Sequence, residues 1–145
     1  MNLPYDLQME VVIRPGTEDD LHAVLKLWQV AETEPTHTDD LASLQQLVAS
    51  DPEALLVAQA GDDLVGSVIA GWDGWRGSIY RLAVAPAHRR RGLAGELVRA
   101  AVTRLGQAGA VRLQAIVVEN DDRAMGFWSN SGWVRQAQRV RFVKG

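Results

Sequence analysis

Three consecutive arginines and a glycine, Arg89 to Gly92, stand between an apolar run and an amphipathic segment. The apolar run at 79–86 predicts a buried strand that ends at a proline, because proline cannot donate a sheet hydrogen bond. Apolar residues then recur at 93, 97, 98, 101, 102 and 105, which is the spacing of one helix face. The first turn of that helix would present free backbone N–H groups inside a cationic loop. Such a helix N-terminus binds anions such as pyrophosphate.

The same loop has a second interpretation, a solvated basic helix start with a small-residue packing contact. The strand before it and the helix after it favour phosphate binding. Gly92 and Ala94 leave the backbone bare, so that phosphate oxygens could approach closely. No lysine followed by Ser or Thr closes a P-loop, and the glycine triplet of a dinucleotide-binding fingerprint is missing.

The pattern Arg89-x-x-Gly92-x-Ala94, after Leu82-x-Val84-x-Pro86, resembles the acetyl-CoA signature of the GCN5-related N-acetyltransferase superfamily, Gln/Arg-x-x-Gly-x-Gly/Ala. The resemblance extends over nearly the whole chain and points to a little-characterised bacterial branch. It implies acetyl transfer from acetyl-CoA to a primary amine by direct attack on the thioester, without a metal. The residues that it implies for acetyl-CoA binding are Leu82, Ala83, Val84, Arg89, Arg90, Arg91, Gly92, Leu93, Ala94, Gly95, Asn120 and Trp128. Among these, the Arg89 and Arg91 side chains are expected to be exposed.

The catalytic groups are less clearly indicated. Where the family has a tyrosine that protonates the leaving thiolate, this chain has Trp128, whose indole only donates hydrogen bonds. Ser129 and Tyr80 are the nearest replacement donors; alternatively, the thiolate takes its proton from water or from the attacking ammonium. Glu119 is a candidate base, and its alternative role is a solvated charge at the end of a strand.

Two segments are candidates for binding the acceptor. Glu32 and Glu34 lie on a polar loop between the first two predicted helices, which border the acceptor site in the family; the alternative is that both are only solvated. The second segment is a Gly-aromatic-Asp-Gly-x-Arg-Gly hairpin, also typical of that bacterial branch, and its candidate side chains are Trp72, Asp73, Trp75 and Arg76. The competing interpretation is a structural turn in which Asp73 hydrogen-bonds its own backbone.

Composition and charge limit the function classes. The chain has 145 residues, 47% of them apolar and 23% charged, which suits one globular domain spanning 1–145. It has no cysteine, signal peptide or membrane-spanning run, so a cytoplasmic protein is expected. Residues 1–72 hold two Lys or Arg against thirteen Asp or Glu, and residues 73–145 hold thirteen against five. One half would suit a cationic acceptor and the other an anionic cofactor, unless the halves intermingle. Nucleic acid is a poor candidate partner.

Periodicity and turn signals predict the order of elements. Strands are expected at 10–14, 54–60, 64–72, 79–86, 111–118 and 139–142; helices are expected from Thr17, around 41–48, from Leu93 to a turn at 106–109, and at 123–130. This order matches an α/β (α+β) acyl-CoA N-acyltransferase fold, with a mixed, mostly antiparallel sheet of 6–7 strands and about 4 helices on both faces. The expected partner is a small-molecule or peptide amine, with no nucleic acid and no membrane; the protein would be a monomer or homodimer. The alternatives are a catalytically weak acyl-CoA-binding regulatory module and a tRNA-acetylating toxin.

Overall fold

The computed structural model describes residues 10–31, 33 and 35–145, so Glu32 and Glu34 lie outside the described residues. The chain forms two compact units, of which the first runs to Gln114 and the second from Ala115 to Gly145. Within the described residues no helix is long and apolar enough to cross a membrane.

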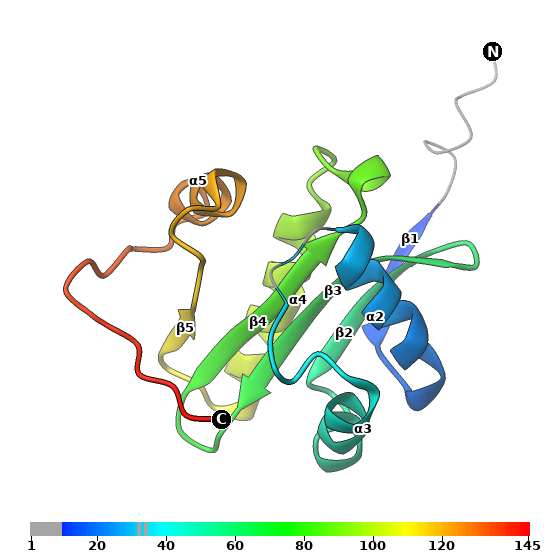
Figure 1. Cartoon of the computed structure of the whole chain (residues 1–145), viewed down its shortest axis with the longest axis horizontal. Helices are drawn as coiled ribbons and strands as arrows, with labels where there is room; N and C mark the ends of the chain where they lie inside the picture. The colour runs from blue at the N-terminus through cyan, green and yellow to red at the C-terminus, as the bar shows by residue number, and fades with distance from the viewer. Residues whose placement is uncertain (1–9, 32, 34) are drawn as a thin grey trace. The chain divides into compact units, whose positions relative to one another are not determined.

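The strands of the sheet follow the order β1-β2-β3-β4-β5, and all of them except the last residue of β5 belong to the first unit (Figure 1). The strands are β1 (Val11–Pro15), β2 (Leu55–Ala60), β3 (Asp63–Trp72), β4 (Gly77–Val84) and β5 (Leu113–Ala115). The three pairings from β1 to β4 are antiparallel. The hairpins implied by the predicted strands 54–60, 64–72 and 79–86 are both present, as β2–β3 and β3–β4.

The sheet has five strands among the described residues, so the expected six to seven are not confirmed. The segment expected as a strand at 139–142 has no regular secondary structure, and all four of its side chains are exposed. Alternation of arginine with apolar residues is not sufficient for a strand, because the backbone N–H and C=O groups also need a neighbouring strand to pair with. The predicted strand 111–118 likewise shortens to the three residues of β5.

Helices α2 (Leu21–Val30) and α3 (Leu41–Ser50) lie on one face of the sheet (Figure 1). The first turn predicted at Thr17 is a 3₁₀ turn, η1 (Glu18–Asp20), which leads directly into α2. Asp20 accepts a hydrogen bond from the Thr17 N–H at 2.8 Å and binds Arg14 of β1 through both carboxylate oxygens, at 2.8 and 2.9 Å. At α3, the Asp40 side chain accepts from the Ser43 N–H at 2.7 Å, as an N-cap does.

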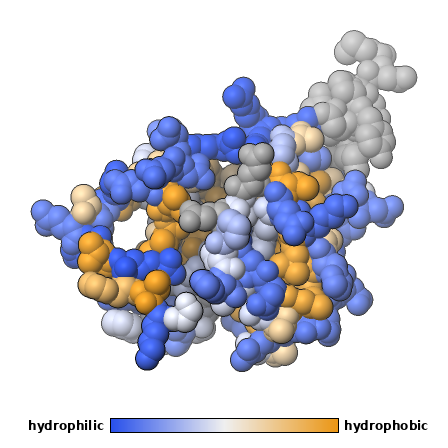
Figure 2. Space-filling view, viewed as in Figure 1, coloured by the Kyte–Doolittle hydropathy of each residue, from blue (hydrophilic) through white to orange (hydrophobic). Residues whose placement is uncertain are grey.

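The apolar side chains of α2 and α3 form a core with the sheet. Its buried members include Leu21, Val24, Trp28, Leu44, Val57 and Ala83. In the region of these two helices the surface is mostly hydrophilic, with hydrophobic patches among the hydrophilic side chains (Figure 2). This pattern is typical of amphipathic helices that cover one face of a sheet.

Helix α4 (Leu93–Ala108) covers the other face of the sheet. A Cβ at Gly66 of β3 would lie 2.8 Å from the Leu97 Cδ1, so the glycine lets the helix approach closely. The turn expected at 106–109 is wrong, because the helix continues through Gly106 to Ala108. It ends at Gly109, whose φ of 112° is accessible to glycine without steric cost.

The second unit contains α5 (Asp122–Asn130), one residue longer than the predicted helix 123–130. Its N-cap is Asp121, whose side chain accepts from the Ala124 N–H at 3.0 Å. A short polar side chain such as aspartate is a preferred N-cap, because its oxygen can accept from a free backbone N–H of the first turn. The residues after α5 form turns and irregular structure.

Candidate functional site

The arginine–glycine loop connects η2 (Pro86–His88) to the N-terminus of α4, as the sequence predicts. The first helical hydrogen bond runs from the Glu96 N–H to the Gly92 carbonyl, so the N–H groups of Leu93, Ala94 and Gly95 precede the helical ladder. A Cβ added at Gly92 or Gly95 would meet nothing within 4 Å, which leaves open space beside these donors. The N-terminus of a 16-residue helix, open to solvent, can hold an anion.

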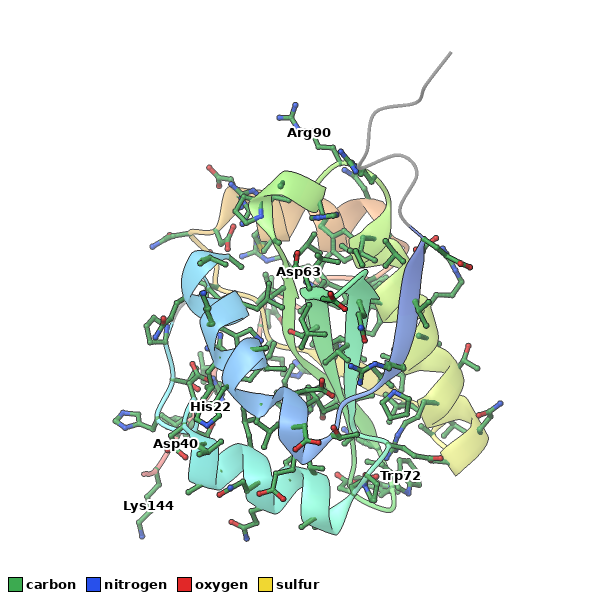
Figure 3. All side chains as sticks on the ribbon, turned by 90° about the vertical axis from the view of Figure 1, so that its right-hand side faces the viewer. His22, Asp40, Asp63, Trp72, Arg90 and Lys144 are labelled. Carbon is green, nitrogen blue, oxygen red and sulfur yellow. The ribbon has the colours of Figure 1, made fainter. Side chains whose placement is uncertain are left out.

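The three arginines of the loop differ in role. The Arg89 Nη2 donates to the Ala31 carbonyl at 2.9 Å, and its side chain is half-buried, so the expected exposure of Arg89 is wrong: it ties the loop to the end of α2. Arg91 is exposed, as expected. Arg90 is exposed and points away from the body of the protein (Figure 3), with a left-handed backbone at φ 64°. Arg90 is therefore the loop arginine best placed to meet an incoming phosphate.

A β-bulge interrupts β4 just before this loop. Ser67 of β3 pairs with Ala83 and Ile69 pairs with Tyr80, so two steps on β3 match three on β4. The extra residue lies at Arg81, whose φ is 52°. A bulge of this kind shifts the alternation of the strand by one residue.

Two hydrogen bonds show the shift directly. The Gly77 N–H, before the bulge, donates to Arg112 beside β5, whereas the Ala85 N–H, after it, donates to Val65 of β3. Backbone N–H groups alternate between the two edges of a strand, and these two residues are separated by an even number of positions. In an unbroken strand their N–H groups would therefore face the same edge. Beyond the bulge, the N–H groups of Leu82 and Val84 therefore face the edge away from β3.

At that edge, β5 contacts the first residues of β4. The Gln114 side chain of β5 donates to the Ser78 hydroxyl at 3.1 Å. The backbone groups of Leu82 and Val84 lie farther along β4, towards the α4 loop. Ala83, which was predicted with them, faces β3 instead through its pairing with Ser67. The bulge thus presents two outward backbone donors at the end of β4 that leads to the N-terminus of α4.

A buried polar network supports the bulge, and the sequence reasoning missed it. Arg81 donates to the Asp39 carboxylate through Nε, at 3.0 Å, and through Nη2, and its guanidinium stacks 4.6 Å from the centre of the Trp28 ring. Only 14% of the Arg81 side chain and 15% of the Asp39 side chain are exposed. Burial lowers the pKa of Arg81 from its ordinary value, but an arginine remains charged at neutral pH. Its signal in the sequence was a charged residue inside an otherwise apolar strand.

The hairpin between β3 and β4 carries Trp72 and Trp75 and is the tryptophan hairpin of this protein. It lies at the opposite end of the sheet from Arg90, as the labelled Trp72 shows in Figure 3. A shallow open pocket of about 230 Å³ is found there, lined by Gly71, Trp72, Asp73, Arg76, Ser78 and Tyr80. The Asp73 Oδ1 accepts from the N–H groups of Trp75 and Arg76 at 2.8 and 2.7 Å, which lowers the pKa of Asp73. Asp73 therefore makes the backbone hydrogen bonds of the competing interpretation. Because it also lines the pocket, its contact with the acceptor stays a prediction.

The aromatic side chains of the hairpin remain available to a ligand. Trp75 is 69% exposed and carries the Arg76 guanidinium 4.2 Å above its ring. Tyr80 is 45% exposed and lines the pocket between the hairpin and the bulge. The pocket can thus offer an aromatic surface, a phenol and a guanidinium.

The predicted site residues of the second unit have local partners or are exposed. Glu119 binds Arg135 at 3.0 Å, and 78% of the Glu119 side chain is exposed. Trp128 is half-buried and packs edge-on against Trp133, with ring centres 4.8 Å apart. Ser129 and Asn120 are exposed. Trp128 therefore belongs to a small aromatic cluster of this unit.

Comparison with known proteins decides the family. The model described as the acetyltransferase (GNAT) family matches residues 21–133. The chain belongs to this family. An acetyltransferase of Pectobacterium atrosepticum is 34% identical over 116 residues, covering 80% of this chain and 82% of the relative. The GNAT match includes β4, the bulge, the arginine–glycine loop and α5.

Two solved structures share the GNAT fold. Ard1 from Thermoplasma volcanium has a TM-score of 0.77 at 23% identity, over 88% of this chain and 84% of that one. The aminoglycoside acetyltransferase AAC(6')-Iy, in complex with a bisubstrate analogue, has a TM-score of 0.73 at 19% identity, over 94% and 98% of the two chains. As a GNAT protein the chain is an acyltransferase that transfers an acetyl group to an amine. Within the described ranges no group of three or more acidic or histidine side chains is arranged to hold a metal.

Proposed function

We propose that this acetyltransferase uses the bulge of β4 and the N-terminus of α4 as its acetyl-CoA site and acetylates a primary amine at the tryptophan hairpin. The observation that carries the proposal is the bulge, which turns the Leu82 and Val84 N–H groups outward on the strand that leads into the open, cationic N-terminus of α4. One structural neighbour, AAC(6')-Iy, binds an analogue that joins CoA to an acetylated amine, which supports this combination of substrates.

The residues present fit acetyl-CoA. The N–H groups of Leu93, Ala94 and Gly95, together with Arg90, would hold the pyrophosphate, because helix N-termini and arginines stabilise phosphate charge. The backbone of Leu82 and Val84 would hold the pantetheine arm. Acetyl-CoA supplies an activated acetyl thioester, whose carbonyl oxygen gains negative charge on attack. The Leu82 N–H, next to the bulge, is the donor that would stabilise this charge.

The acceptor would enter over the pocket of the hairpin. Trp72, Trp75 and Arg76 would select the acceptor, and the pocket is too open to impose a single shape on it. Its chemical class is a primary amine on a small molecule or a peptide. Glu32 and Glu34, outside the described residues, stay predicted acceptor contacts.

Tyr80 is the best-placed candidate for proton transfer, because its phenol lines the pocket and lies two residues from Leu82 on the same strand. Ser129 and Glu119 stay predicted catalytic residues, and Asn120 and Trp128 stay predicted CoA contacts. The ion pair with Arg135 would make Glu119 a weaker base, because a neighbouring cation favours the carboxylate.

The two compact units would form one acetyltransferase domain, as the sequence predicts for 1–145. The family match supports this, because it crosses the boundary between Gln114 and Ala115. A cytoplasmic location and a monomeric or homodimeric state stay predictions.

Charge reversal at the loop tests the donor site. Arg90→Glu should weaken CoA binding about tenfold or more, since it replaces a charge-assisted phosphate contact with repulsion. Arg99→Glu is the matched control, because Arg99 is an exposed arginine on the body of α4 and the change in net charge is the same. Isothermal titration with CoA measures both. Equal affinities for the two variants would contradict a pyrophosphate site at Arg90.

A further inference from the structure

We infer that Ser67, held by Trp28, is a positioning residue for acetyl transfer that acts through the Arg81 carbonyl to fix the direction of the Leu82 N–H. The inference rests on the proposed function. None of the sequence motifs points to Ser67, which is a completely buried polar residue on β3.

The direction of the hydrogen bonds at Ser67 is fixed by chemistry. The Trp28 Nε1 donates to the Ser67 hydroxyl at 2.8 Å, and an indole can only donate. The single hydroxyl hydrogen is therefore left for the Arg81 carbonyl, at 3.1 Å. The Trp28 N–H and the Ser67 hydroxyl both have partners, and Trp28 is only 3% exposed. The series of hydrogen bonds from Trp28 through Ser67 to Arg81 therefore has one direction.

Arg81 needs such support because of its backbone. A φ of 52° is unfavourable for a residue with a Cβ and persists where the surroundings over-determine it. Ser67 holds the carbonyl of Arg81, while Asp39 and the Trp28 ring hold its guanidinium. Trp28 thus acts on Arg81 in two ways. Its N–H holds Ser67, which in turn holds the Arg81 carbonyl, and its ring stacks directly against the Arg81 guanidinium.

The consequence reaches the reacting atoms through one peptide unit. The Arg81 carbonyl carbon is bonded to the Leu82 nitrogen, so fixing the carbonyl also fixes the Leu82 N–H, which is antiparallel to it in a planar trans peptide. The Ser67 hydroxyl pulls the carbonyl towards β3, and the N–H then faces the outer edge. Without this contact, the peptide between Arg81 and Leu82 would lose the partner that holds it in the bulged orientation.

Steady-state kinetics on Ser67→Ala tests the inference. The turnover number kcat should fall about 10- to 100-fold, as expected when a catalytic donor is misplaced by a fraction of an ångström to an ångström. The KM for acetyl-CoA should change less than about threefold, because the pyrophosphate site on α4 and the Val84 contact to the pantetheine arm are untouched. Trp28→Phe keeps the aromatic ring but removes the donor, and should lower kcat in the same direction. In the double variant the two effects should not add, because both act through one carbonyl.

Val24→Ala is the matched control, because Val24 is a fully buried residue of the same helix and core and lies outside the network. Its kcat should remain at the wild-type level where the variant is folded. Wild-type kcat in folded Ser67→Ala, or an equal loss in Val24→Ala, would overturn the inference. If Ser67→Ala does not fold, wild-type kcat in Trp28→Phe overturns it in the same way.

Failure of the proposed function would be seen separately, as an inactive wild-type protein. In that case the ¹H–¹⁵N NMR spectrum of the backbone amides tests the inference without activity. The ¹H–¹⁵N resonances of Arg81, Leu82 and Ala83 should move in Ser67→Ala or Trp28→Phe and stay in place in Val24→Ala. Unmoved resonances in the two network variants would overturn the inference without any reference to activity.

Discussion

At the scale of single residues, two arginines have a left-handed backbone, and their side chains have opposite surroundings. Arg81 is half-buried and held by Asp39, whereas Arg90 is exposed at the tip of the loop before α4. A non-glycine residue in this conformation costs about 1–2 kcal/mol, and nothing around Arg90 offsets that cost among the contacts of the described residues. An arginine in such a place fits a role in binding rather than in stability.

Arg90→Gly separates these two roles. Glycine removes the steric cost of the left-handed conformation and adds backbone entropy to the unfolded state, so the free energy of unfolding should stay within about 1 kcal/mol of wild type or rise slightly. CoA affinity should nevertheless fall, because the charge is lost. Denaturant titration and calorimetry measure the two quantities. A variant that loses stability and keeps its affinity would show that Arg90 serves the fold instead.

At the scale of elements, the connection from β1 through η1 to α2 depends on one carboxylate. Asp20 binds Arg14 and caps its own turn, and these contacts lower the pKa of Asp20 to about 2, with the Arg14 hydrogen bond as the largest cause. Because the folded pKa lies below the ordinary value of 3.8, the stabilisation is complete above about pH 4 and is lost as the pH falls through about 2.

Asp20→Asn should therefore lower the free energy of unfolding at pH 7 by about 1 kcal/mol, because solvent screens a partly exposed ion pair, and this difference from wild type should shrink between pH 4 and pH 2. Asp19→Asn, at the exposed neighbouring position, should change little at either pH. Urea denaturation at pH 7, 4 and 2.5 measures the three proteins. A constant difference between Asp20→Asn and wild type over this range would contradict the ion-pair account.

Elements defined by local signals were predictable from the sequence. The strand at β4, the loop and α4 follow one another within about thirty residues, and each has its own pattern of apolar, proline and glycine residues. The Arg81–Asp39 pair could not be found in this way, because 42 residues separate its members. Ser67 carried no signal either, since a serine within a strand pattern does not show which hydrogen bonds it makes. The strand expected at 139–142 failed for a related reason, because pairing depends on a neighbour that alternation does not reveal.

At the scale of the whole molecule, ion pairs link the acidic and the basic part of the sequence. Arg81 binds Asp39 and Arg104 binds Asp51, so two basic residues from the second half neutralise acidic residues of the first. The halves therefore intermingle within the first unit, as the alternative reading of the charge asymmetry proposed. Among the ion pairs of the described residues none involves Arg90, which is exposed and so accessible to an anionic cosubstrate.

The central claim, acetyl transfer from acetyl-CoA to a primary amine, is tested most directly by release of the CoA thiol. Wild-type protein and Arg90→Glu are mixed with acetyl-CoA and a panel that contains a polyamine, an aminoglycoside, free amino acids and a peptide with an unblocked N-terminus. The account predicts that at least one amine triggers thiol release, with an equal amount of acetylated amine by mass spectrometry, and that Arg90→Glu requires more acetyl-CoA for the same rate. Acetyl-CoA binding without amine-dependent thiol release would contradict it and would indicate an acyl-CoA-binding regulatory module.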